Sequence, residues 1–454
     1  MNQDTIYQFV KQLNSEFIGP ILVLVLVGAG IYFTIRLKFV PQFYFRALRS
    51  IFKTSQNKGK ASVSEGISPI QALSTAIASQ VGTGNIVGVA MALLMGGPGA
   101  LFWIWVSSLL GMSTNFAEAI LSQLYKTNTA NGNLIGGPSY YIHQGLHSKW
   151  LACLFSFFFI LAMGMIGIMV QANSISSAIV SIMPGHISPL WIGVPLAVLS
   201  GLVFCGGIAR IAPFAEKVVP MMAGVYVLGS LVFIALHIGD VIPVFGEIFK
   251  CAFTLHAGVG GAVGATMMSA VRYGVSRGLF SNEAGLGTTP HSHALAKVDH
   301  PYEQGMMAVI GISVNLIICT LTGLILLLSG VFDHGTDLVG VQLMQAALAP
   351  SFGEAGKWFI AISLFFFAFS TIVGWYFFAA QNVRYLFGEK PIYAYRGLVM
   401  VLVVVASMIE VPLIWELADT CNLFIVIPNV IALLYLSKQV VAERNRMGKD
   451  YGKS

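Results

Sequence analysis

Long apolar stretches, repeated along nearly the whole chain, limit what this sequence can fold into. A run of about 20 apolar residues crosses the hydrocarbon core of a bilayer as an α-helix. Only 10% of the 454 residues are charged, against about 25% in a soluble globular protein. Lipid offers the backbone no hydrogen-bond partners, so a helix that supplies its own is required. The sequence therefore predicts an all-α polytopic membrane protein.

Eleven stretches of this kind can be distinguished, so we expect eleven transmembrane helices. Several are longer than a bilayer requires and would tilt or continue past it. The net charge of +6 lies in the loops between them and does not indicate a nucleic-acid partner. The expected spans are residues 17–36, 68–94, 98–125, 150–183, 188–207, 212–238, 258–281, 304–330, 357–387, 394–410 and 412–437.

Basic residues give the orientation of these spans through the positive-inside rule. With the N-terminus outside, all but four of the 25 Lys and Arg residues fall on the inner side. No secretory signal is evident, so residues 17–36 are interpreted as a retained first span. We therefore expect the N-terminus outside and the C-terminus in the cytoplasm. The inner segments are then 37–67, 126–149, 208–211, 282–303, 388–393 and the C-terminal tail.

Setting the first span aside leaves ten, which divide into two sets of five. Because five is odd, the second set enters the membrane in the opposite direction, as in an inverted repeat. The first member of each set, 68–94 and 258–281, is rich in glycine and polar residues. Interrupted helices at matching positions of two inverted halves point to a transporter site. The expected parts of the chain are an N-terminal helix with a basic loop (1–67), a first repeat (68–238), a second repeat (258–437) and a basic tail (438–454).

The interruption in the first of these spans reads Val-Gly-Thr-Gly-Asn at residues 81–85. If the helix opens there, the N–H groups of Thr83 and Gly84 start a second half-helix whose positive dipole end favours a carboxylate. The carbonyls of Ala78 and Val81 end the first half-helix and would face a small cation. The alternative is that the glycines only let helices pack closely, as a GxxxG pair does. Two such spans at equivalent positions favour the binding site.

A cation held by these carbonyls needs further hard oxygen ligands. Ser370 and Thr371 lie in the third span of the second half, and Thr371 shares a helical face with Trp375. We expect Thr371 to bind the ion and Trp375 to wall the pocket. The competing explanation is that both hydroxyls only bond back to their own helix. Gln171, in the third span of the first half, either donates to a substrate carboxylate or bridges two helices.

Charged groups within a membrane indicate function by default. Those in or beside the spans are Glu118, Arg272, Arg277 and Glu283. We expect the two carboxylates to pair with basic neighbours, in a structural or gating role rather than in direct substrate contact. No acidic residue is expected in the binding site itself, which favours sodium over a proton as the coupling ion.

Metal and enzyme chemistry are not indicated. His291 and His293 share an inner loop with no further ligand set, and the five cysteines show no paired spacing. No nucleophile–base pair occurs at a matching depth in the membrane. The chain is therefore not expected to be an enzyme, and no cofactor is expected besides the coupling ion.

Three glycine-rich motifs together resemble a known transporter family. They are VGTGN at 81–85, GGPGA at 96–100 and GLFSNEAG at 278–285. With the pattern over nearly the whole chain, they are similar to the bacterial and archaeal alanine or glycine:cation symporters. The resemblance implies a LeuT-like core of five plus five inverted helices with one additional N-terminal helix, in the cytoplasmic membrane of a prokaryote. The first motif is also similar to the broken first core helix of the sodium:neurotransmitter symporters.

The same resemblance implies a role for individual residues. Two aromatic residues, Phe280 and Trp375, would limit the substrate side chain to roughly a methyl group. The implied substrate-binding residues are Thr83, Gly84, Gln171, Phe280 and Trp375. The implied sodium ligands are Ala78, Val81, Ser370 and Thr371.

The resulting expectation is a secondary active transporter that imports alanine or glycine with sodium by alternating access. A proton-coupled symporter is the alternative, followed by a channel and a non-transporting amino-acid sensor. A channel would need rings of acidic or carbonyl groups along a pore, which the sequence lacks. The expected partners are alanine or glycine, sodium and membrane lipid.

Overall fold

The computed structural model describes residues 3–38, 66–129, 132, 134–185, 187–254, 267–332, 335, 337–409 and 412–450. Within them almost everything is helical, apart from one short antiparallel pair, β1 (Thr127–Asn128) and β2 (Leu134–Ile135). The helices of the first half are α1 (Gln3–Leu13), α2 (Gly19–Arg36), α4 (Pro69–Gln80), α5 (Val89–Gly96), α6 (Gly99–Leu124), α7 (Pro138–Gly145), α8 (Lys149–Leu161), α9 (Ile168–Val180), α10 (Leu190–Phe204) and α11 (Ile208–Leu236). Those of the second half are α12 (Val241–Phe253), α13 (Met267–Asn282), α14 (Pro290–His293), α15 (Pro301–Leu328), α16 (Gly340–Phe352), α17 (Glu354–Phe387), α18 (Pro391–Met408), α19 (Pro412–Tyr435) and α20 (Ser437–Asp450). The π-helical turns are Asn14–Ile18, Gly84–Gly88 and Ala162–Gly167, and Ile238–Asp240 is a short 3-10 helix.

The described residues form eight helices long and apolar enough to cross a membrane, or nine when the bent pair α4–α5 is one span. The helix α10 is apolar but has only 15 residues. Residues 258–266 of the expected span 258–281 lie outside the described part, as does most of the loop 37–67. The all-helical membrane class is thus confirmed. The count of eleven, the inverted repeat and the division into parts stay predictions.

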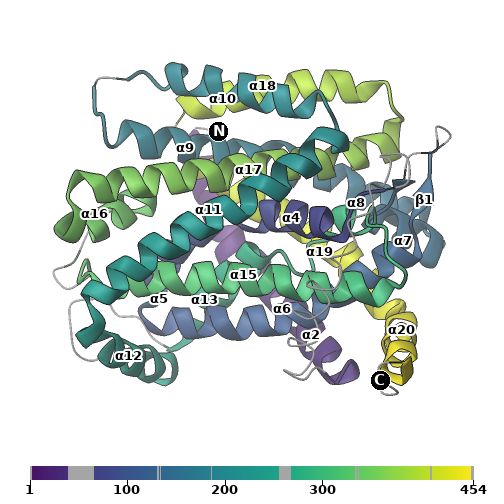
Figure 1. Ribbon diagram of the computed structural model, residues 1–454, viewed down its shortest axis with the longest axis horizontal. Coiled ribbons are helices and arrows are strands. Elements are labelled where there is room, and N and C mark those ends of the chain that lie inside the picture. Colours follow the sequence, from purple (N-terminus) through teal and green to yellow (C-terminus); the bar gives the residue numbers. More distant parts are fainter. Residues whose placement is uncertain are drawn as a thin grey trace.

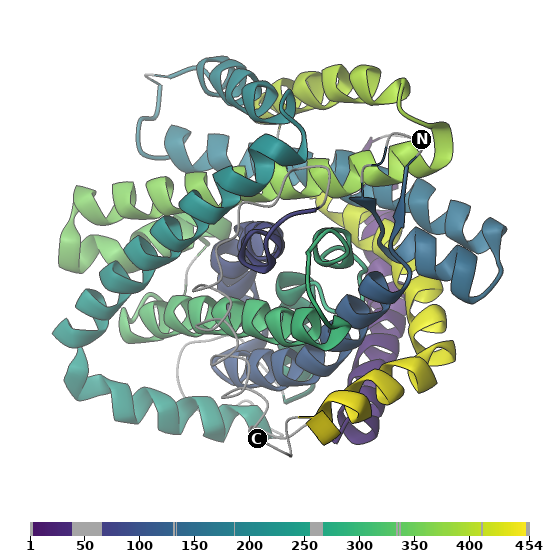
Figure 2. The same cartoon turned by 45° about the vertical axis from the view of Figure 1, so that its right-hand side comes forward.

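The helix that carries the first interruption lies inside the molecule. Figure 1 shows α15 and α17 running along the long axis, with α4 between them and α11 crossing obliquely. The helices α10 and α18 pack together along one edge, and α12 lies near the opposite one. In Figure 2, α4 (dark blue) lies near the centre, enclosed by longer helices. Every residue from Ala72 to Gln80 is accordingly buried.

Two glycines four residues apart set the packing of α13 against α6. A Cβ at Gly274 would lie 2.7 Å from the Cβ of Trp103, and one at Gly278 would clash with the Ser107 hydroxyl. Small residues let membrane helices approach closely, and van der Waals packing then holds them together. The glycines of α13 are therefore packing residues, and the expectation that they interrupt the helix is wrong. The chain leaves helical conformation only after Asn282.

The GxxxG pair of the first interrupted span, Gly84 and Gly88, does not behave in this way. A Cβ at Gly88 would meet nothing within 4 Å, and one at Gly84 would meet its nearest neighbour at 3.5 Å. Close packing of this GxxxG pair therefore does not explain the first interruption.

The segment after α13 folds back into the bundle. Residues 281–296 are all buried, and they include the one-turn helix α14. A parallel bridge between Ile67 and Ala296 ties the end of this segment to the residues that lead into α4. This part of the expected inner segment 282–303 thus packs within the bundle, where side chains satisfy its backbone, and its side of the membrane stays a prediction.

Candidate substrate and ion site

The first helix break lies where the sequence predicts it. The helix α4 ends at Gln80, helical structure resumes at Gly84, and the two axes differ by 51°. The N–H of Gly82 donates to the side-chain oxygen of Asn85 at 3.0 Å, which holds the turn from within. A Cβ at Gly82 would lie 2.5 Å from the hydroxyl oxygen of Thr371. Glycine is therefore required here because α17 approaches the turn so closely.

Four backbone carbonyls surround the hydroxyl of Thr371. Its Oγ1 lies 3.0 Å from the oxygen of Ala78, 3.4 Å from that of Ser79 and 3.3 Å from that of Val81. The fourth carbonyl, of Phe367, belongs to its own helix and lies at 3.0 Å. One hydroxyl proton can satisfy only one of these carbonyls at a time. The convergence of neutral oxygens on one point is the arrangement that a hard cation needs.

Ser370 extends this oxygen cluster. Its hydroxyl lies 3.3 Å from the carbonyl of Ala78 and 2.9 Å from that of Phe367. Both hydroxyls thus bond to their own helix, as the competing explanation requires, yet both also reach across to α4. The structure brings all four expected ligands together and adds the carbonyl of Ser79. That carbonyl could have been foreseen as one of the last, unsatisfied carbonyls of a helix that ends at Gln80.

The amide side of the break is occupied by Gln171 of α9. The N–H of Thr83 donates to the side-chain oxygen of Gln171 at 3.1 Å. The hydroxyl of Thr83 is fully buried and has no hydrogen-bond partner among the residues that the structure describes. The oxygen of Gln171 thus takes the position on the Thr83 N–H that we expected for a carboxylate. Gln171 thus bridges α9 and the break, as one of its two interpretations has it, and its donation to a substrate carboxylate stays a prediction.

The end of α13 lies opposite Gly84. A Cβ at Gly84 would be 3.5 Å from Cα and 3.7 Å from Oγ of Ser281. Phe280, the expected boundary of the substrate space, is half-buried, and it is Ser281 that faces the break. Asn315 of α15 joins the two breaks, because its amide donates to the carbonyls of Gln80 at 2.8 Å and Ser281 at 2.9 Å. The only signal for Asn315 in the sequence is a single amide within a long apolar span.

Trp375 contacts an acidic residue at the second break. Its indole N–H donates to Oε1 of Glu283 at 2.7 Å, and a Cβ at Gly167 would lie 2.6 Å from its ring. The other oxygen of Glu283 accepts from the hydroxyls of Ser79 at 3.0 Å and Thr288 at 2.6 Å. Glu283 therefore borders the expected site through Trp375, while the expectation that no acidic residue lies in the binding site itself stays a prediction. The chain reverses after α13, which turns Glu283 toward α4 and α17.

The second buried carboxylate, Glu118 of α6, holds the same segment. It accepts from the N–H groups of Gly285 at 3.2 Å and Gly287 at 2.9 Å, and from the amide of Asn429 at 2.6 Å. In the described part of the chain neither Glu118 nor Glu283 forms a salt bridge, so the expected basic neighbours are wrong. Backbone N–H groups, hydroxyls and ring or amide N–H groups serve instead, because non-helical backbone at membrane depth must be satisfied by protein.

The two arginines and the histidines take no part in this site. Arg277 lies 4.0 Å from Asp419, and Arg272 donates to a backbone carbonyl. His291 is buried between the rings of Phe159 and Phe378. Among the described residues no group of three or more His, Cys, Asp and Glu side chains could hold a metal ion.

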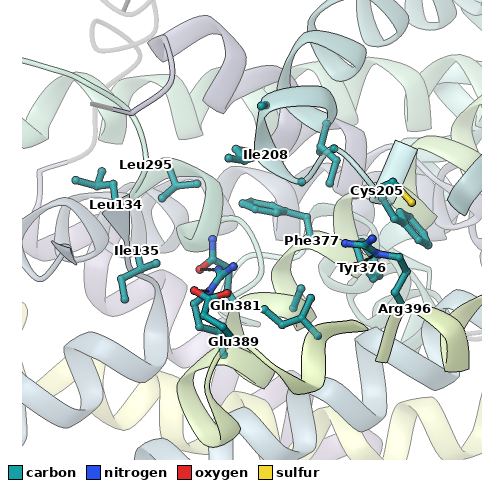
Figure 3. A pocket seen from close by; sticks show the side chains of 18 of the residues that line it. Leu134, Ile135, Cys205, Ile208, Leu295, Tyr376, Phe377, Gln381, Glu389 and Arg396 are labelled. Atoms are coloured by element: carbon teal, nitrogen blue, oxygen red, sulfur yellow. Dashed lines mark hydrogen bonds and ion pairs between the residues drawn. The ribbon is translucent and has the colours of Figure 1, made fainter. Parts of the chain in front are cut away.

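A pocket of about 410 Å³ lies between the ends of α10, α11, α17 and α18 (Figure 3). Its lining includes Cys205, Tyr376, Gln381, Glu389 and Arg396, from or next to segments expected on the inner side of the membrane. Along α17, Tyr376 lies five residues beyond the ion ligand at position 371, or about 8 Å of helix. The pocket therefore lies toward the side that the sequence predicts to be cytoplasmic.

An all-helical bundle whose central helix is broken at a buried polar site is the fold of a membrane transporter. Solved structures agree with this fold. The chain is similar to a variant of the Eremococcus coleocola manganese transporter, with a TM-score of 0.54 at 13% sequence identity over 81% of this chain and 76% of that one.

Sequence comparisons define the family. Residues 3–453 match the sodium:alanine symporter family. The chain is 41% identical to the sodium/alanine symporter AgcS of Methanococcus maripaludis, over 96% of this chain and 95% of that protein. It is 35% identical to the probable sodium/glutamine symporter GlnT of Bacillus subtilis, over 99% and 93% of the two chains. The chain belongs to the sodium:alanine symporter family, and it is a cation-coupled amino-acid symporter and not an enzyme.

Proposed function

We propose that this protein imports alanine or glycine together with sodium across the cytoplasmic membrane of a prokaryote, by alternating access. The observation that carries the proposal is the convergence of three carbonyls at the end of α4, those of residues 78, 79 and 81, on the hydroxyl of Thr371. Sodium loses its hydration shell when it enters such a site, and carbonyl and hydroxyl oxygens replace the lost water. The oxygens are all neutral, which suits a monovalent ion.

The two helix ends that meet beside Gly84 suit a zwitterion. The N-terminal end of the second half-helix is positive, and the C-terminal end of α13 is negative. A carboxylate would take the N–H and the unpartnered hydroxyl of Thr83 after displacing the oxygen of Gln171. The ammonium group would face the end of α13 at Ser281. Because Ser281 lies within 3.7 Å of a Cβ position at Gly84, the space suits a small side chain.

Uptake into proteoliposomes tests this proposal directly. We expect labelled alanine or glycine to accumulate above its external concentration when sodium is present outside, and glutamine to compete poorly because of its size. Saturable, concentrative uptake would exclude a channel, and transport of any kind would exclude a sensor. No sodium-dependent accumulation of either amino acid would refute the proposal.

Proton coupling is the second candidate, and Glu283 is the observation that favours it. A buried carboxylate that contacts both α4 and α17 could carry a proton in the place of an ion. A pH gradient imposed without sodium separates the two candidates. We expect it to drive no uptake, whereas uptake under these conditions would make the proton the coupling ion.

A further inference from the structure

Glu283 has an unusual backbone conformation for its residue type. It is the first residue after α13, it has a φ of +57°, and its side chain is 2% exposed. Residues other than glycine rarely adopt positive φ, and they keep it only where the surrounding structure demands it. The hydrogen bonds of its carboxylate account for the positive φ here.

Three elements meet at this carboxylate. Its hydrogen-bond donors are Ser79 of α4, Thr288 of the segment after α13, and Trp375 of α17. Thr288 would suffice to close the local turn. The other two donors come from the pair of helices that supply the candidate sodium ligands.

The same two residues connect the carboxylate to the ion ligands. Ser79 donates its hydroxyl to Glu283, while its carbonyl lies 3.4 Å from the hydroxyl of Thr371. Trp375 follows Thr371 by one turn of α17. Any change in the separation of α4 and α17 at the ion ligands therefore changes the geometry around Glu283.

On its other side, Glu283 is joined to the substrate half of the site. Ser281, two residues earlier, lies opposite Gly84. The N–H of Glu283 donates to the carbonyl of Leu279, which makes it the last residue tied to α13 by a helical hydrogen bond. A shift of this carboxylate is thus a shift of the end of α13.

We propose that Glu283 is the positioning residue that couples sodium occupancy to amino-acid affinity, an inference that rests on the proposed function. With sodium bound, α4 and α17 are held together, both donors reach the carboxylate, and the end of α13 is fixed beside Gly84. Without sodium the two helices separate, one donor is lost, and the end of α13 is released. Sodium therefore tightens amino-acid binding through Glu283.

Glu118 provides a matched control. It is also a buried carboxylate with three donors, and it holds the same segment at Gly285 and Gly287. Its third donor is Asn429 of α19, so its hydrogen bonds within the described part of the chain involve neither α4 nor α17. A substitution there loosens the segment without touching the link to the ion ligands.

The test measures binding of labelled alanine or glycine to purified protein at zero and at saturating sodium. The ratio of the two dissociation constants is the coupling factor. We expect Glu283→Gln to lower this factor at least ten-fold, with the dissociation constant at zero sodium changed by less than about three-fold. Glu118→Gln is expected to keep the wild-type factor. Size-exclusion profiles establish that both variants are folded.

A wild-type factor in Glu283→Gln would overturn the inference, and so would an equal loss in Glu118→Gln. If Glu283→Gln does not fold, Trp375→Phe decides, because it removes one donor and keeps an aromatic ring beside Gly167. A lowered factor in Trp375→Phe supports the coupling role, and an unchanged one overturns it. A wild-type protein that shows no sodium effect would refute the proposed function, and the coupling role with it.

Discussion

At the scale of single residues, the hydroxyl of Thr371 lies beside carbonyls that no helical N–H group satisfies. The helix α4 ends at Gln80, so its last carbonyls have no partner within their own helix. The hydroxyl of Thr371 lies near two of them and near the carbonyl of Val81, but its one proton satisfies a single carbonyl at a time, which leaves lone pairs free. The site therefore depends on an oxygen at this position rather than on the shape of the side chain.

We expect Thr371→Ala to raise the sodium concentration for half-maximal alanine uptake by about ten-fold or more. A bond to a charged group contributes roughly 1.5–3 kcal/mol, and each 1.4 kcal/mol is about ten-fold. Thr371→Ser retains the oxygen and should stay within about three-fold of the wild type. Ser200→Ala, which removes a buried hydroxyl bonded to its own helix, is the second control. An unchanged sodium dependence in Thr371→Ala would count against this ion site.

The second prediction concerns the space around Gly82 rather than the ion ligands. Its substitution by alanine places a methyl group 2.5 Å from the oxygen of Thr371 and 3.1 Å from that of Gln171. We expect Gly82→Ala to abolish sodium-dependent uptake, because Thr371 must move away from the carbonyls. Gly88→Ala adds the same methyl group six residues later, where nothing lies within 4 Å, and should transport normally. Equal uptake by the two variants would contradict the prediction.

At the scale of elements, α13 is held by two different kinds of contact. Its glycine face packs on α6, and its end is held by the side chains of Asn315 and Glu283. Packing keeps the helix in place, while hydrogen bonds set the conformation of its last turn. We therefore expect the glycine face to affect stability.

Gly274→Ala tests this expectation. The new methyl group would lie 2.7 Å from the Cβ of Trp103, and overpacking of this kind costs about 1–3 kcal/mol. We expect a lower Tm for the protein in detergent, with the sodium dependence of any remaining uptake unchanged. Gly224→Ala in α11 has open space around its Cβ and should keep the wild-type Tm. A Tm that falls equally in both variants would mean that helix packing is not the cause.

At the scale of the whole molecule, the pocket at the ends of α10, α11, α17 and α18 allows the predicted orientation of the chain to be tested. Its lining comes from α10, α11, α17 and α18, and it lies on the side that the basic residues predict to be cytoplasmic (Figure 3). Cys205 lines this pocket and is exposed, whereas Cys319 and Cys421 are buried. A thiol is therefore already present where the predicted topology can be tested.

We expect a membrane-impermeant maleimide to label Cys205 in inside-out vesicles and not in right-side-out vesicles. Cys153 and Cys251 are half-exposed and are replaced by serine for this measurement. A further Cys205→Ser substitution should remove the signal. Labelling of Cys205 from the outer face would reverse the predicted orientation of the chain.

Much of the fold and part of the candidate site could be predicted from the sequence, because they depend on local properties. Apolar length shows where helices cross the membrane, and the polar glycine-rich run at 81–85 shows where one of them breaks. The contact of the Thr371 hydroxyl with the carbonyls of Ala78 and Val81 could be anticipated, because both the broken span and the span with this hydroxyl were assigned to one site. The roles of these residues in binding remain proposals.

The rest depends on contacts between residues far apart in the chain. Glu283 with Ser79 and Trp375, and Asn315 with both breaks, join segments that no periodic pattern relates. In lipid, helices associate through close packing and hydrogen bonds rather than through an apolar stripe, so apolar periodicity does not show which faces meet. The sequence by itself determined the all-helical membrane class and the position of the first break. Only the tertiary structure decided that the chain leaves α13 at Glu283, and that this buried acidic residue contacts both α4 and α17.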